Sequence, residues 1–169
     1  MKKVFLLVML LFSIIGFSQN ESIEAFLEKW ENSKTYLVEI AKAMPEESYS
    51  YKPTEREMSF REQLLHIKGN MDWLGTTYFT ADKFEKKKDE KTYSKEEIIS
   101  MLEMSFDKVY EVIKNTKPEA LKDKVAFFAG PKTKLQILNL LQDHVTHHRG
   151  QLIVYLNLNE IKPPSYVGW

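Results

Sequence analysis

The sequence contains no cysteine among its 169 residues, which excludes disulfides, thiolate metal sites, a cysteine nucleophile and an N-terminal lipid on cysteine. It also lacks an excess of charge of either sign, with 24 basic and 24 acidic side chains. No basic surplus indicates a nucleic-acid partner, and no acidic block indicates a charged tail. Internal repeats and low-complexity stretches are missing as well, and the length fits one domain with a proper core.

The chain has no apolar run long enough for a comfortable membrane span of about 20 residues. The longest run, Val4–Phe17, follows a short positive start, and the small residues Gly16 and Ser18 stand at the −3 and −1 positions of a cleavage site. These features predict a cleaved Sec-type signal peptide over residues 1–18 and a mature domain over residues 19–169. The alternative is an uncleaved membrane anchor. A cleaved signal implies a periplasmic or secreted protein with no stable membrane span.

Apolar residues recur at three- and four-residue spacing in four segments of the mature chain, and almost nothing alternates as a strand does. Three of these segments open with a Ser or Thr cap that has Glu or Gln three residues later. The predicted helices are about Glu21–Met44, Ser59 to near Thr80, Ser94 to before Pro118, and Thr133 through at least Tyr155. The connection Leu121–Pro131 favours a turn or short hairpin. Together the segments predict an all-α fold, a four-helix bundle whose longer connections permit non-neighbouring helix order.

The histidines are few and clustered, with His66 in the second helix and His144, His147 and His148 in the fourth. His144 and His148 replace apolar residues on the inward stripe, and residues four apart differ by about 40° around a helix. With His66 from a facing helix they would form a three-nitrogen metal site with open positions, as in catalytic sites. Burying imidazoles costs free energy unless each finds a partner, and a metal supplies one. His147, about 100° from His148, is expected to flank the site, although a His144–His147 pair at about 60° stays open.

Three neutral imidazoles suit a divalent ion, with zinc or nickel preferred and iron or manganese as alternatives. Such an ion lowers the pKa of coordinated water and polarises a substrate oxygen, which allows hydrolysis or activation of a bound thiol. Ligation needs neutral rings, and the ordinary imidazole pKa is about 6.5. We therefore expect metal affinity to fall below about pH 6.5.

Several familiar catalytic motifs are missing. Val145 stands where a zincin protease has its glutamate base, and the chain has no GxSxG and no phosphate-binding glycine loop. No acid precedes His144 or His148 by three residues, as a carboxylate di-iron bundle would require. We assign no catalytic side chain and no organic cofactor. Gln151 is a pocket-lining candidate, and Arg149 is interpreted as a salt-bridge or interface residue.

Two segments and the C-terminal end resemble the DinB family, also described as DinB/YfiT-like metalloenzymes. Ser59–Ile67 is similar to the family's second-helix entry, His144–Leu152 to its fourth-helix signature, and Pro163–Tyr166 to its usual end. The resemblance covers essentially the whole mature chain and implies a four-helix bundle with a metal near one end. Carried over to this sequence, the implied ligands are His66, His144 and His148.

The resemblance also implies a homodimer formed through bundle faces. Some relatives are transferases or isomerases that use small thiols such as bacillithiol or mycothiol, and those relatives are cytoplasmic. This chain carries a predicted export signal, and small thiols are scarce and oxidised outside the cytoplasm. The leading hypothesis is therefore an exported, metal-dependent hydrolase that acts on a small molecule. The alternatives are a thiol-dependent transferase and a non-catalytic metal-binding or partner-binding bundle.

Overall fold

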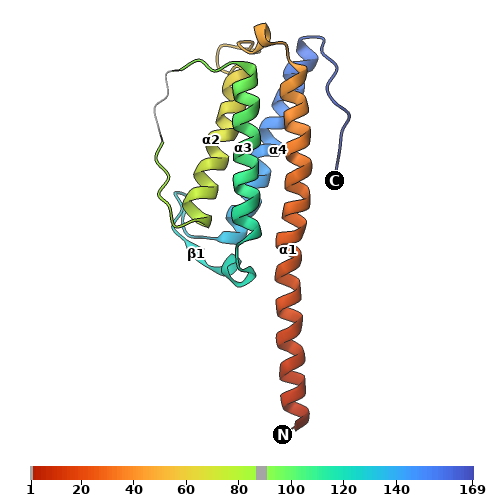
Figure 1. Cartoon of the computed structure of the whole chain (residues 1–169), viewed down its shortest axis with the longest axis vertical. Coiled ribbons are helices and arrows are strands. Elements are labelled where there is room, and N and C mark those ends of the chain that lie inside the picture. The colour runs from red at the N-terminus through yellow and green to blue at the C-terminus, as the bar shows by residue number, and fades with distance from the viewer. Residues whose placement is uncertain (1, 87–90) are drawn as a thin grey trace.

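The computed structural model describes residues 2–86 and 91–169, with side chains placed from Glu21 onward. Four long helices account for most of the chain, and they confirm the predicted all-α four-helix bundle (Figure 1). The helices are α1 (Lys2–Ala43), α2 (Phe60–Phe79), α3 (Lys95–Lys114) and α4 (Lys134–Leu158). The short elements are the 3-10 helices η1 (Glu46–Ser48) and η2 (Pro118–Lys122) and the strands β1 (Lys124–Val125) and β2 (Lys132–Thr133).

The helix order around the bundle differs from the order along the chain. α1 packs mainly against α3 and α4, and α2 packs mainly against the same two helices. Helices that follow each other, α1 with α2 and α3 with α4, therefore occupy diagonal corners. α2 and α3 run in the same direction, and the connection between them returns along the side of the bundle (Figure 1). This order brings α2 and α4 side by side.

Each of the three helices α2, α3 and α4 begins with a complete capping box, as the sequence predicts. The hydroxyl of the cap accepts a hydrogen bond from the backbone N–H three residues on, and that residue's side chain accepts one from the backbone N–H of the cap. The pairs are Ser59 with Glu62, Ser94 with Glu97, and Thr133 with Gln136. These local bonds fix where each helix starts and therefore which side chains face inward.

α1 begins at Lys2, upstream of Glu21 where the apolar spacing predicted the first helix to begin. The intervening sequence contains leucine and methionine, which favour helix, and no proline that would end it. The predicted signal peptide, residues 1–18, lies outside the described side chains, so its cleavage stays a prediction. Among the described residues, no helix has the length and apolar character that crossing a membrane requires.

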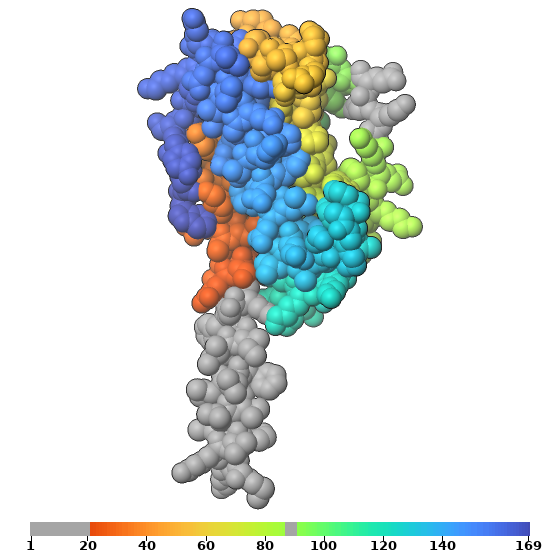
Figure 2. Space-filling view, turned by 180° about the vertical axis from the view of Figure 1, so that it is seen from behind, coloured from red at the N-terminus to blue at the C-terminus, as the bar shows by residue number. Residues whose placement is uncertain are grey.

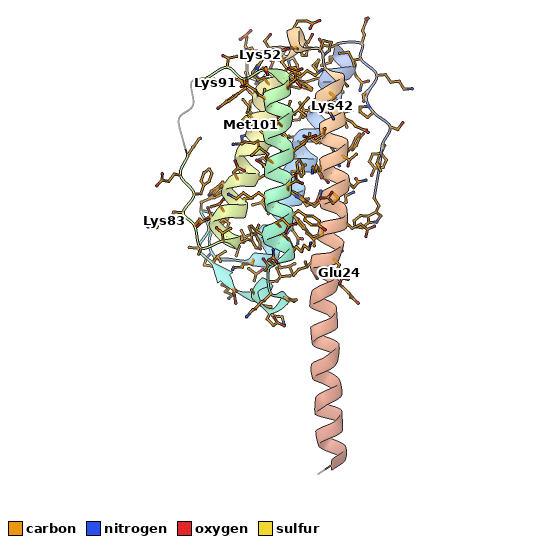
Figure 3. The ribbon with its side chains drawn as sticks, viewed as in Figure 1. Glu24, Lys42, Lys52, Lys83, Lys91 and Met101 are labelled. Atoms are coloured by element: carbon orange, nitrogen blue, oxygen red, sulfur yellow. The ribbon has the colours of Figure 1, made fainter. Side chains whose placement is uncertain are left out.

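The bundle interior is filled by apolar side chains from all four helices (Figure 3). Trp30 of α1 is fully buried against Phe106 of α3, and its Nε1 donates a hydrogen bond to the Phe106 carbonyl oxygen at 3.0 Å. On α3, Ile98 is fully buried, whereas its neighbour Ile99 is half-buried, so the rotation of α3 presents Ile98 to the core.

The connection before α4 forms the short hairpin that its sequence suggested. β1 and β2 pair antiparallel, with Lys124 opposite Thr133 and Val125 opposite Lys132. The backbone N–H of Gly130 donates to the carbonyl of Phe127 at 3.0 Å and closes a turn between the strands. Gly130 has φ of 88°, in the left-handed region that glycine adopts without steric cost. The hairpin thereby holds the Phe127–Gly130 turn against the bundle.

Candidate metal centre

The three predicted ligands come from two helices that pack against each other. His66 lies on the second turn of α2, and His144 and His148 lie one turn apart near the midpoint of α4. α2 and α4 are packed neighbours, although α3 separates them in the chain. The site therefore lies on the side of the bundle, near the beginning of α2 and at mid-length of α4.

The three imidazoles converge. One ring nitrogen from each of His66, His144 and His148 can be chosen so that all three lie within 4.8 Å of one another. The Nε2 atoms of His66 and His144 are 3.1 Å apart. Two nitrogen ligands at about 2.05 Å from a tetrahedral zinc ion would be about 3.3 Å apart, so this spacing fits a shared ion. The ring centroids are 4.5 to 4.9 Å apart, so the rings surround one point.

The site changes from buried to open across the three rings. His148 is buried, with 6 % of its surface exposed, His144 is half-buried and His66 is exposed. The open side is therefore the side of His66, where a small molecule can approach from solvent. Three protein ligands leave further coordination positions of a divalent ion unfilled, which is the arrangement of catalytic rather than structural sites.

Loss of hydration and neighbouring positive charge favour the neutral form of the three imidazoles. Burial lowers the pKa of His144 to about 3, with the neighbouring histidines adding to the effect. It also lowers the pKa of His148 to about 4, and the other rings act in the same direction. The pKa of His66 is lowered first by burial and then by the positive charge of Lys86. At neutral pH all three rings therefore offer lone pairs, which is the state that metal ligation requires.

A hydrogen-bond network behind the site fixes the orientation of His148. Its Nδ1 lies 2.6 Å from Oε1 of Gln63, which is fully buried. Because an amide oxygen only accepts, His148 carries its proton on Nδ1 and leaves Nε2 free to ligate. The Gln63 amide nitrogen donates to Gln151 Oε1 and to the Tyr155 hydroxyl, and that hydroxyl donates to the Met58 carbonyl. Gln63 is thereby held in one orientation.

Sequence reasoning did not single out Gln63. The available signal was its position three residues before His66, on the side of α2 that turns toward the core. Gln151, predicted to line the pocket, instead bridges Gln63 and His147, since its Nε2 lies 3.1 Å from the Nε2 of His147. His147 itself is exposed and outside the converging group, so the structure favours the predicted flanking position over a His144–His147 pair.

Two other neighbours of the histidines face away from the site. Asp143 is exposed. Arg149 is 5 % exposed and packs between α4 and α1, with its guanidinium 4.9 Å from the centre of the Tyr36 ring and Nη1 3.5 Å from Ser33 Oγ. It is thus an interface residue within the bundle, and among the described residues no carboxylate forms a salt bridge with it.

The residues present fit a divalent metal ion. The Nε2 atoms of His66 and His144 face each other at 3.1 Å, and a ring that carries its proton on Nδ1 offers only a lone pair at Nε2. Two lone pairs that face each other do not satisfy one another, and a buried polar atom without a partner costs free energy. An ion between the converging nitrogens would accept these lone pairs. The donor set of three neutral imidazoles is one that zinc, nickel and ferrous iron accept.

A separate cavity of about 400 Å³ lies at the end of the bundle where α3 finishes and α4 begins. It is lined by residues of α2, α3, η2 and the first turn of α4, among them Phe79, Glu111 and Lys134. None of the histidines lines this cavity. The converging histidines on the α2–α4 face therefore lie outside this cavity.

Solved structures of similar fold come from two Bacillus species. A DinB-like protein from Bacillus cereus ATCC 10987 superposes with a TM-score of 0.73 and 22 % identity, over 85 % of this chain and 97 % of that one. The DinB-like protein YjoA from Bacillus subtilis superposes with a TM-score of 0.69 and 19 % identity, over 84 % of this chain and 96 % of that one. At these identities the likeness shows the fold.

Sequence comparison points to the same group of proteins. The uncharacterized protein YjoA of Bacillus subtilis strain 168 is 27 % identical over 129 residues, which cover 70 % of this chain and 78 % of YjoA. The family model that matches is described as the DinB family, and it matches residues 18–166. The match includes α1 from residue 18 onward, the whole of α2, α3 and α4, and the three converging histidines. The chain therefore belongs to the DinB family.

Proposed function

We propose that this protein is a metal-dependent hydrolase in which His66, His144 and His148 hold a divalent ion. The observation that carries the proposal is the convergence of three neutral imidazole nitrogens within 4.8 Å of one another on an open face of the bundle. When bound, such an ion supplies Lewis-acid chemistry by lowering the pKa of coordinated water and polarising a substrate oxygen.

The side chains around the site are arranged to bind the ion and to expose it on one side only. His148 and Gln63 form the closed, buried side, where the amide of Gln63 fixes the tautomer of His148. His66 forms the open side, next to the connection that carries Lys86. The arrangement supports an ion that is fixed on its buried side by His148 and Gln63 and that substrate reaches on its open side, at His66.

Zinc or nickel is the proposed ion, with iron or manganese as the alternative. Zinc and nickel both accept imidazole, whereas manganese prefers carboxylate and water oxygens, which the converging group does not supply. The proposal also includes export through the predicted signal peptide. An extracytoplasmic site would meet little reduced thiol, and this favours hydrolysis over thiol transfer.

The first experiment measures metal content and turnover on protein purified without an affinity tag. We expect about one zinc or nickel ion per chain, and turnover of ester or amide substrates by the metal-loaded protein without added thiol. His148→Ala should lose both the metal and the turnover. His147→Ala is the matched control, because His147 adjoins His148 but lies outside the converging group; it should keep both.

Three results would contradict parts of this proposal. Protein that contains no metal and takes up neither zinc nor nickel would remove the metal centre. Turnover that appears only after a small thiol is added would replace hydrolysis with thiol transfer. Metal that is held without turnover in either condition would leave a binding protein.

A further inference from the structure

The side of α2 that carries His66 continues beyond the metal centre. Asn70 and Trp73 follow His66 by four and seven residues, so they lie on the same side of the helix, with Trp73 about 10 Å further along the axis. The Asn70 Oδ1 atom is buried and has no hydrogen-bond partner among the described side chains. Moving along α2 from His66, the half-buried side chain of Asn70 comes next, followed by the half-buried indole of Trp73.

Trp73 is part of a group of stacked aromatic rings that we call the aromatic wall, made of Trp73, Phe127 and Phe128. The Trp73 ring lies 6.1 Å from Phe127 at 19° and 6.4 Å from Phe128 at 26° between ring planes. The two phenylalanine rings are 4.3 Å apart. The wall therefore joins α2 to the turn of the hairpin. In Figure 2 the hairpin (teal) lies beside α4 (blue) on the face that is shown.

Phe128 is held where it contacts solvent rather than core. It follows Phe127 in the turn that the Gly130 N–H closes, and 84 % of its surface is exposed. Exposing an aromatic side chain forfeits the free energy of burying it, and exposed apolar groups rimmed by polar ones often mark binding sites. Lys83, labelled in Figure 3, lies on the connection beyond α2.

We propose that the metal centre acts on small molecules that carry an aromatic ring, and that the aromatic wall binds this ring while the reacting group lies at the three histidines. A ring placed on Trp73 and Phe128 gains offset stacking and removes apolar surface from water. The inference rests on the proposed metal centre and specifies its substrate class.

The test uses hydroxamates, which chelate divalent ions and need no turnover to be measured. Binding to the zinc-loaded protein is measured by calorimetry for acetohydroxamate, 4-phenylbutanohydroxamate and 4-cyclohexylbutanohydroxamate. We expect the phenyl compound to bind at least about tenfold more tightly than acetohydroxamate, and more tightly than its cyclohexyl analogue, because stacking adds to burial. Phe128→Ala and Trp73→Leu should each reduce the phenyl advantage by at least about threefold.

Tyr166→Ala is the matched control, because Tyr166 is 80 % exposed but lies in the C-terminal tail against Tyr36. It should leave the phenyl advantage unchanged. The inference is overturned when all three compounds bind equally, or when the advantage survives both wall substitutions, since the rings would then only hold the hairpin. Failure of every hydroxamate, acetohydroxamate included, would overturn the metal centre itself together with this inference. Binding of acetohydroxamate without a phenyl advantage overturns only the aromatic wall.

Discussion

At the scale of single residues, the three histidines are held in different ways. His148 is buried and hydrogen-bonded through Nδ1 to Gln63, His144 is half-buried with an unpartnered Nδ1, and His66 is exposed. The ring with the firmest support is thus the one furthest from solvent. We expect His148 to set the position of the ion and His66 to adjust to it.

Replacing Gln63 with leucine removes the acceptor that fixes the tautomer of His148 while keeping the volume similar. We expect metal affinity to fall by about 10- to 100-fold, as is usual when the partner of a ligating histidine is lost. The measurement is a competitive titration against a chelating indicator. In the metal-free wild type, nitrogen-detected NMR should show His148 protonated on Nδ1, and the variant should lose this preference.

Gln142→Leu serves as the control for the Gln63 variant. Gln142 is a half-buried amide of α4 that donates to Ser33 Oγ at 2.8 Å, and among the described residues its hydrogen bonds involve none of the three histidines. We expect it to cost about 1 kcal/mol of stability without changing metal affinity. Equal losses of affinity in the two variants would show that Gln63 acts through general packing and not through His148.

The pH dependence of metal binding follows from the lowered pKa values. Protons compete with the ion only where they bind the imidazoles, and burial lowers the pKa of His148 to about 4 and of His144 to about 3. The pKa of His66 is also lowered from the ordinary imidazole value of about 6.5. Metal affinity should therefore stay nearly constant from pH 8 to about 6.5, begin to fall below that value, and fall most steeply toward pH 4, where His148 also takes up a proton. Isothermal titration across this range checks it.

Acid should also lower the free energy of unfolding of the metal-free protein. A histidine whose folded pKa is depressed takes up its proton more readily when unfolded, so unfolding is favoured as pH falls from about 6.5 toward 3. Above about pH 6.5 both states are neutral and this contribution is absent. His144→Gln should therefore flatten part of the acid limb of a urea-midpoint profile. An unchanged acid limb in this variant would show that protonation of groups other than His144 causes the loss of stability in acid.

The candidate ligands could be inferred from the sequence, whereas their support could not. His144 and His148 interrupt an apolar stripe of fixed period, so their inward direction follows from α4 alone. Gln63 forms hydrogen bonds with His148, 85 positions away, and with Tyr155, 92 positions away. The sequence around Gln63 has no pattern that indicates either contact. Periodicity describes the direction in which a side chain points, and not the side chain that it meets.

At the scale of elements, the capping boxes and the hairpin determine where each helix begins. The starts of α2, α3 and α4 could be predicted because a capping box is complete within four residues. The rotation of α3 could not, since Ile98 and Ile99 are equally apolar and only packing against α1 and α2 decides which is buried. The ordering of the helices around the bundle likewise depends on contacts between distant segments.

The hairpin turn can be tested through Gly130. Its φ of 88° is unfavourable for residues with a Cβ, so Gly130→Ala should destabilise the protein by about 1 kcal/mol. Gly150→Ala is the opposite case, because Gly150 lies in α4 with open space where a Cβ would be. It should stabilise by about 0.5 to 1 kcal/mol through helix propensity. Denaturant midpoints measure both, and the same sign for both changes would contradict this description.

At the scale of the whole molecule, metal binding and folding should be coupled. An ion that binds only the folded state adds about 2.7 kcal/mol at a free concentration of 100 times its Kd. For a domain of this size that corresponds to a rise in Tm of about 5 to 10 °C. Differential scanning calorimetry with and without zinc measures the rise. His148→Ala should abolish it while His147→Ala keeps it, and a rise that persists in His148→Ala would place the ion elsewhere.

The diagonal arrangement of consecutive helices has a consequence for the chain cut in two. His66 belongs to the α1–α2 half, and its partner His144 stands 78 residues away in the α3–α4 half. Neither half alone holds all three histidines. If the connection after α2 were cut and the two fragments were mixed, tight zinc binding would occur only when the fragments reassociate. Zinc binding would therefore measure how well the two halves recognise each other.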